Sequence, residues 1–324
     1  LSAWDSVDDK ISELRSKLDT VTSYEMWEEN KAEVTASSAE NEEDFMKASA
    51  ESNAVQGTYD FNITHLAQSQ KVAGASAADI TGNSDADAST ELGLEGAFTV
   101  GGQEITIATT DSLNDIRNSI NTAAENMSEA DEVQANIIDN RLIMRRVQTG
   151  TTNISISESP ASGADEPILG SGGLDLWDSS TGFHHETQAG QDLQMTVDGL
   201  AVTRSSNSEI TDIIQGVSLD FEQTGTATLE VGPDVETMTS NIDDFISAYN
   251  SAMTEAENKT NVSVNNDDVS TAVLHGSSLL RRFQMKARDM VMTNDPDLTA
   301  DFDRLSRIGI GTTSASNRLS VTDS

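Results

Sequence analysis

The chain opens with the helical pattern Trp4-Asp-Ser-Val7-Asp-Asp-Lys-Ile11-Ser-Glu-Leu14-Arg-Ser-Lys-Leu18-Asp-Thr-Val21. Its large apolar residues are separated alternately by three and four positions: Trp4, Val7, Ile11, Leu14, Leu18 and Val21. This spacing is the a/d heptad stripe of a coiled coil, a narrow seam that packs against another helix. The sequence therefore predicts a helix over residues 4–21 that requires a helical partner.

The same stripe returns near the other end of the chain, after the helix-start signal Pro233-Asp234. It consists of Met238, Ile242, Phe245, Tyr249, Ala252 and Ala256. Each large seam residue left in water forgoes roughly 1.5–3 kcal/mol of burial energy. We therefore expect the two ends to pack against each other. The seam then holds the bundle together through Trp4, Val7, Ile11, Leu14, Leu18, Val21, Met238, Ile242, Phe245 and Tyr249. The alternative is that each seam pairs with another copy of the chain.

Two further helices are predicted beside these stripes. One covers about residues 41–53, where Phe45 and Met46 are the large apolar residues. The other contains Val273, Leu280, Phe283, Ala287, and Met290 or Val291.

The middle of the chain has the period-two alternation of β-strands. Residues 59–64 predict a strand, residues 97–107 a hairpin turning at Gly101-Gly102, and residues 193–204 a hairpin turning at Asp198-Gly199. A helix with Leu113, Ile116 and Ile120 is expected to be capped by Asp111. A short turn capped by Ser208 or Asn207 precedes the last strands. Residues 74–96 and 160–190 are predicted loops, the second anchored only by Trp177 and Phe183.

These elements predict a multidomain α+β fold. A discontinuous helical bundle is built from residues 1–55 and 233–324. A β-rich head domain is formed by residues 56–95 and 187–232, and a distal α+β head domain by residues 96–186.

The composition excludes several classes of function. The chain has 55 acidic and 19 basic residues, a net charge of −36, which disfavours binding to nucleic acid or to an anionic membrane. No apolar run is long enough to insert into a membrane. Cysteine is absent, which excludes disulfides and thiolate chemistry. The start shows no cleavable signal and no Met, so a preceding segment is expected. The acidity favours a high-salt habitat; an ordinary acidic surface and a calcium-loaded protein are the alternatives.

No enzyme, cofactor or metal site is predicted. The chain contains His65, His184, His185 and His275. Neighbouring residues on an extended segment point to opposite faces, so His184 and His185 are expected to chelate poorly. The acidic clusters lack the spacing of a calcium-binding loop. There is no G-x-S-x-G elbow and no phosphate-binding loop.

An ordered set of motifs resembles the hook-associated protein 2 family, the caps of bacterial flagellar filaments. The segment ending in Ile120-Asn121 is similar to the "IN" motif of flagellin and hook proteins. The motifs follow one another along nearly the whole chain: Gly57–Gln70, Ser112–Asn121, Val133–Ala135, Val197–Asn207, Ile214–Leu219, Phe245–Asn250, Arg307–Gly311 and Asn317–Leu319.

The resemblance implies a helical leg domain made by both chain ends, two β-rich head domains, and outermost coiled-coil helices that lie outside this sequence. It also implies a structural role at the filament tip, with flagellin and a homo-oligomeric ring as partners. An export chaperone and secretion by the flagellar type III system, without signal cleavage, are implied as well. The alternatives are a hook–filament junction protein or an extracellular adhesin with the same motif.

Overall fold

The computed structural model describes residues 2–36, 45–158, 168–265, 268–293, 304–312 and 318–321. The chain forms two compact units. The helical unit comprises Leu1–Asn30 and Pro233–Ser324, and the β-rich unit comprises Lys31–Gly232. The fold is mixed α+β, as predicted. The first predicted helical segment, 1–55, is longer than the first part of the helical unit because strands begin at Asn30.

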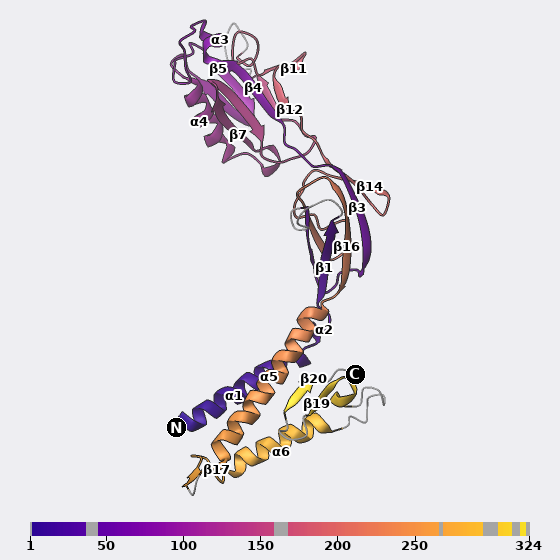
Figure 1. Ribbon diagram of the computed structural model, residues 1–324. Coiled ribbons are helices and arrows are strands. Elements are labelled where there is room, and N and C mark those ends of the chain that lie inside the picture. Colours follow the sequence, from indigo (N-terminus) through magenta and orange to yellow (C-terminus); the bar gives the residue numbers. More distant parts are fainter. Residues whose placement is uncertain are drawn as a thin grey trace. The chain divides into compact units, whose positions relative to one another are not determined.

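The helical unit is organised around two antiparallel helices, α1 (Ser2–Thr22) and α5 (Val235–Thr260). The Ser6 hydroxyl donates to Glu255 at 2.6 Å, and Lys17 pairs with Asp244 at 2.7 Å. Moving forward along α1 therefore means moving backward along α5. Figure 1 shows the two helices side by side. The two ends of the chain thus pack against each other, as the matching stripes predict.

The rest of the helical unit packs around this pair. Its other elements are α2 (Tyr24–Trp27), the strands β17 (Val262–Asn265) and β18 (Asp268–Thr271), α6 (Ser278–Met292), η3 (Leu305–Arg307), β19 (Ile310–Thr312) and β20 (Leu319–Val321). Leu280 of α6 packs with Val7 and Ala256 in one small core. Ile310 and Leu319 of the final hairpin pack against α5 in another.

One core of the β-rich unit lies between a five-stranded sheet, a two-stranded sheet and the loops around them. The strands of the larger sheet are, in spatial order, β1 (Asn30–Ala36), β16 (Gly225–Pro233), β3 (Gly57–His65), β13 (Leu193–Val197) and β14 (Leu200–Arg204). The smaller sheet pairs β15 (Val217–Phe221) with β2 (Met46–Ala50). Phe61 and Phe221 join the two sheets, with ring centroids 5.9 Å apart.

The second core of the β-rich unit is built around α4 (Leu113–Ala124). Ile116 and Ile120 of this helix are buried against a four-stranded sheet. The sheet order is β12 (Glu186–Gln188), β4 (Lys71–Ser76), β8 (Arg141–Arg146) and β7 (Val133–Ile138). The other elements are α3 (Ala77–Thr81), β5 (Gly96–Val100), β6 (Gln103–Ile107), η2 (Glu129–Asp131), β9 (Ile156–Glu158), β10 (Trp177–Asp178) and β11 (Gly182–Phe183).

Both predicted two-residue hairpin turns are confirmed. Gly101 and Gly102 have φ values of 54° and 77°. Asp198 and Gly199 have φ values of 50° and 79°. Positive φ at both central residues is the type I′ turn that matches the twist of paired strands. A side chain at Gly101 would also approach the Met127 sulfur to 2.4 Å.

Three asparagines that end family-like motifs make the same contact. Each side-chain amide donates to the carbonyl and accepts from the N–H of one distant residue. Asn121 binds Ala135 at 2.9 and 2.8 Å, Asn207 binds Ala67 at 2.9 and 2.7 Å, and Asn250 binds Leu319 at 2.9 and 2.8 Å. The amide replaces a strand partner and satisfies two backbone groups together. Each asparagine thereby fixes one segment against another.

Replacing Asn121 with alanine tests this contact. The change leaves the N–H and carbonyl of Ala135 without these partners, and Ala135 is only 4% exposed. We expect a loss of about 2–3 kcal/mol of unfolding free energy, measured by urea denaturation. The exposed Asn118 on the same helix provides the control. If Asn118→Ala costs as much as Asn121→Ala, the amide contact does not stabilise the fold.

Several sequence predictions are wrong. Residues 46–50 form strand β2, because Met46, Ala48 and Ala50 alternate toward the core while β15 supplies the hydrogen bonds. The residues 41–44 of that predicted helix lie outside the described residues. Ser112 caps α4 in a reciprocal box with Asp115, while Asp111 binds the N–H of Ala108.

The predicted loops also contribute to the core. Residues 77–81 form α3, and Leu92 is buried. Leu169, Leu174 and Leu176 are at most 1% exposed, so Trp177 and Phe183 are not the only anchors of the later segment. Residues 207–214 contain an isolated bridge between Ile210 and Leu219 in place of a capped helical turn. Burial here depends on distant partners, which leave no periodic pattern in a short segment.

Candidate functional site

The structure brings most of the predicted seam together. Val7 and Tyr249 are 2% exposed. Ile11, Leu14, Ile242 and Phe245 pack partly buried against the same cores. Four seam residues lie outside these cores: Trp4 and Leu18 are 40% and 37% exposed, and Val21 and Met238 are half-buried. The predicted seam is therefore only partly closed, and Val7 and Tyr249 are its most buried members.

Sequence reasoning missed a second apolar row on α5. Ile246 and Met253 are buried at 8% and 2% exposure. Each immediately follows a residue of the predicted stripe, so the apolar face of α5 is wider than a two-helix seam requires. That width is the available sequence signal that α5 contacts more than one partner. In the structure, α6 and the final hairpin contact this face.

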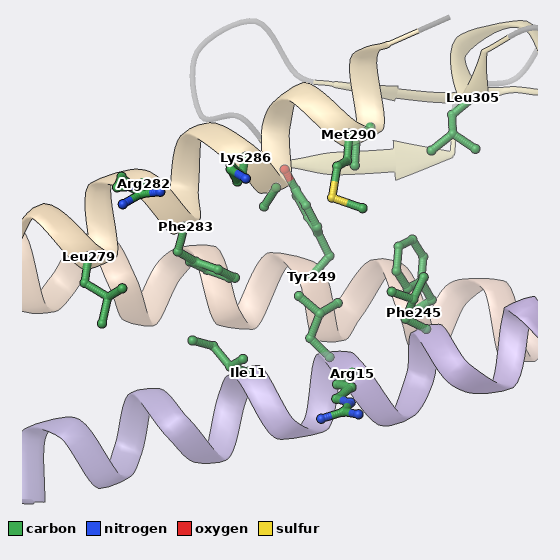
Figure 2. A pocket seen from close by; sticks show the side chains of 14 residues that line it. Ile11, Arg15, Phe245, Tyr249, Leu279, Arg282, Phe283, Lys286, Met290 and Leu305 are labelled. Carbon is green, nitrogen blue, oxygen red and sulfur yellow. The ribbon is translucent and has the colours of Figure 1, made fainter. Parts of the chain in front are cut away.

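Helices α1, α5 and α6 enclose an apolar groove of about 630 Å³ within the helical unit. Figure 2 shows α1 forming one wall, α6 the opposite wall and α5 the floor between them. The floor is formed by Phe245 and Tyr249. Ile11, Leu14 and Leu18 line the α1 side. The groove therefore includes five of the predicted seam residues.

The walls of the groove are positively charged. Arg15 lies on α1, and Arg282 and Lys286 lie on α6, across the groove from it (Figure 2). None of the 14 lining residues is acidic. In a chain with a net charge of −36, this local excess of cations distinguishes the groove from the protein as a whole.

One polar atom of the groove is unsatisfied. The Tyr249 hydroxyl is buried and has no hydrogen-bond partner among the described residues. Burial raises the pKa of Tyr249, and the charges of Arg318 and Arg288 offset part of this effect. An unpaired buried hydroxyl costs about 1–3 kcal/mol. The Tyr249 hydroxyl is therefore a buried polar group that the contacts of α5 with the other described residues leave without a hydrogen bond.

The two adjacent histidines meet at one carboxylate. Asp175 contacts His184 Nδ1 at 2.5 Å and His185 Nε2 at 3.0 Å. Burial acts to raise the pKa of Asp175, but the hydrogen bonds from His184 and His185 outweigh it and lower the pKa. The two rings contact different oxygens of that carboxylate, and Asp175 itself has a left-handed φ of 51°. Within the described ranges, no group of three or more potential ligands is arranged to hold a metal ion.

Of the other two histidines, His65 lies at the end of β3, and His275 donates from Nδ1 to the Thr260 carbonyl at 2.9 Å; both are exposed. Among the described residues, none of the helices combines the length and apolar composition that crossing a bilayer requires.

The groove is the strongest candidate for a functional site, because it combines an apolar lining with cations on both walls.

Comparisons with known proteins agree with the motif resemblance. Residues 1–70 match the family model for the N-terminus of flagellar hook-associated protein 2, and residues 190–324 match the model for its C-terminus. The B-type flagellar hook-associated protein 2 of Pseudomonas aeruginosa is 27% identical over 296 residues, which is 84% of this chain and 58% of that protein. The Escherichia coli K12 protein is 28% identical over 287 residues, covering 85% and 58%.

Solved structures extend the likeness to the fold. The D1-D2-D3 domains of the flagellar cap protein FliD from Escherichia coli match with a TM-score of 0.63 and 24% identity, covering 99% of this chain and 84% of that one. FliD (HAP2) from Pseudomonas aeruginosa PAO1 matches with a TM-score of 0.50 and 27% identity, covering 68% and 99%. The chain spans about three fifths of the length of these curated relatives. It belongs to the flagellar hook-associated protein 2 family.

Proposed function

We propose that this protein caps the distal end of the bacterial flagellar filament, where it promotes the folding and polymerisation of flagellin and prevents the loss of monomers. The observation that supports this most is the pairing of α1 with α5. Helix α1 lies in residues 1–70 and α5 in residues 190–324, so the pairing joins the two segments that match the family models. The mechanism is steric and conformational, and it uses no catalytic residue, cofactor or metal.

In this proposal the helical unit is the leg that stands on the filament end. The β-rich unit supplies the head domains of a homo-oligomeric ring, which shelters incoming flagellin. Weak contacts between leg and filament re-form as each subunit adds. The chain reaches the tip by flagellar type III export without signal cleavage, accompanied by a chaperone. The seam residues keep the leg rigid while its contacts with the filament break and re-form.

Deleting the gene in its source organism tests the proposed function. We expect hooks to remain, filaments to be lost, and monomeric flagellin to accumulate in the medium. Electron microscopy and immunoblotting of the medium measure these outcomes. Complementation with the wild-type gene is the control.

The alternatives predict other outcomes of the same deletion. An adhesin deletion leaves filaments intact and reduces only attachment. A junction protein is recognised in the complemented strain instead, where labelled protein stays at the base of the filament and is absent from its distal end. Either result contradicts the cap.

A further inference from the structure

The groove between α1 and α6 has the length of a site for a helix of about three turns. Along α6, the residues Leu279, Arg282, Lys286 and Met290 recur at helical spacing and all line the groove. Leu279 and Met290 are eleven residue steps apart, which corresponds to roughly 16 Å along the axis, or about three helical turns. Leu279 and Met290 are 63% and 75% exposed. An exposed apolar rim on a groove of this length is typical of surfaces that bind an amphipathic helix.

The charges of the groove specify the chemistry of its occupant. Arg15, Arg282 and Lys286 form no ion pair with any residue that the structure describes. They face each other across an apolar floor, so an occupant with acidic flanks would pair with cations on both walls. Charge complementarity of this kind favours one class of partner and orients it. A basic or neutral apolar helix would gain only the free energy of burying its apolar surface and would form no ion pairs with the walls.

A second copy of the chain does not supply such a helix from its described residues. The apolar stripe of α1 is used against α5 and in the groove itself. Helix α5 is the floor. On α6, Met285 and Met292 are exposed outside the groove lining, but this helix has four basic residues and one acidic residue, so it offers no acidic flanks. Packing two grooves face to face would place Arg15, Arg282 and Lys286 opposite the same cations. Like charges in an interface disfavour that arrangement.

We propose that the groove binds an acidic amphipathic helix of three to four turns, presented by the protein subunit at the filament end on which the leg stands. This inference rests on the proposed function. The apolar stripe of that helix enters between α1 and α6, above Phe245 and Tyr249. Acidic residues on its flanks pair with Arg15 on one side and with Arg282 and Lys286 on the other.

Binding of monomeric flagellin from the same organism to the full protein tests the proposal. Fluorescence anisotropy of labelled flagellin at 0.15 M NaCl measures the affinity. A synthetic helical peptide with leucine stripes and glutamate flanks is a second probe, and its lysine-flanked counterpart is the charge control. We expect the variant Arg282→Glu/Lys286→Glu to weaken both flagellin and acidic-peptide binding about tenfold or more.

The matched control for the single variant Arg282→Glu is Arg281→Glu, on the same helix and also exposed, but outside the groove lining. It should change affinity by less than about threefold. Met290→Gln, which removes exposed apolar surface from the rim, should weaken binding about fivefold without lowering the melting temperature. These positions are exposed, so the variants fold, and circular dichroism checks this.

Three results would overturn the inference. Equal effects of Arg281→Glu and Arg282→Glu mean that only general charge attraction is measured. Self-association that is lost in Arg282→Glu, in sedimentation, assigns the groove to a second copy. If the wild-type protein does not bind flagellin, and a strain with Arg282→Glu/Lys286→Glu makes normal filaments, the groove does not bind a filament subunit. The deletion phenotype is independent of all three, so the cap function can stand while the groove proposal fails.

Discussion

Val7→Asp will unfold the helical unit, while Ser12→Asp will leave it folded. Val7 is 2% exposed and packs with Ala256 of α5 and Leu280 of α6. A carboxylate there is buried without a cation, at a cost of about 3–5 kcal/mol. Ser12 lies on the exposed face of the same helix, so its substitution adds the same charge in water. Ile11→Asp should cost less, because Ile11 is only partly buried and borders the groove.

Circular dichroism at 222 nm follows the loss of helix, and limited proteolysis identifies which unit opens. We expect cleavage in the segments 2–22 and 235–260 of Val7→Asp at a temperature where Ser12→Asp resists. The β-rich unit should keep its own transition, since it has separate cores. If both variants melt like the parent, residues 4–21 do not form a buried seam with α5.

Raising NaCl from 0.1 to 2 M will increase the melting temperature on the order of 10 °C. The chain has a net charge of −36, and two like charges 10 Å apart in water repel by about 0.4 kcal/mol. Many such pairs together oppose folding by roughly 3–5 kcal/mol, which corresponds to about this shift for a domain of 150–250 residues. Molar salt shortens the screening length to about 3 Å and removes most of the repulsion.

A charge-reduced variant separates screening from general effects of salt. Glu91, Glu95 and Glu125 are exposed and form no ion pair with a described residue. Their triple replacement by glutamine should raise stability at 0.1 M NaCl and flatten the dependence on salt. A melting temperature that decreases when NaCl is raised from 0.1 to 2 M contradicts the high-salt hypothesis. An unchanged dependence in the triple variant shows that salt acts on apolar burial alone.

The sequence alone determined the elements whose signals are local. Alternate spacings of three and four residues predicted α1 and α5 and their need for each other. Gly101-Gly102 and Asp198-Gly199 predicted two hairpins, because positive φ at both turn residues selects the residue types there. The order of the motifs identified the family. In each case the identities and spacing of a few neighbouring residues are enough to determine the local structure or the motif.

Only the tertiary structure decided which distant groups meet. Leu169, Leu174 and Leu176 are core residues because other segments cover them. Residues 46–50 form a strand because β15 is beside them. The partners of Asn121, Asn207 and Asn250 lie 14, 140 and 69 positions away. The groove likewise requires three helices to converge and leaves Arg15, Arg282 and Lys286 around it. Burial and charge pairing depend on contacts between segments that are remote in the chain, and periodicity within one segment does not encode them.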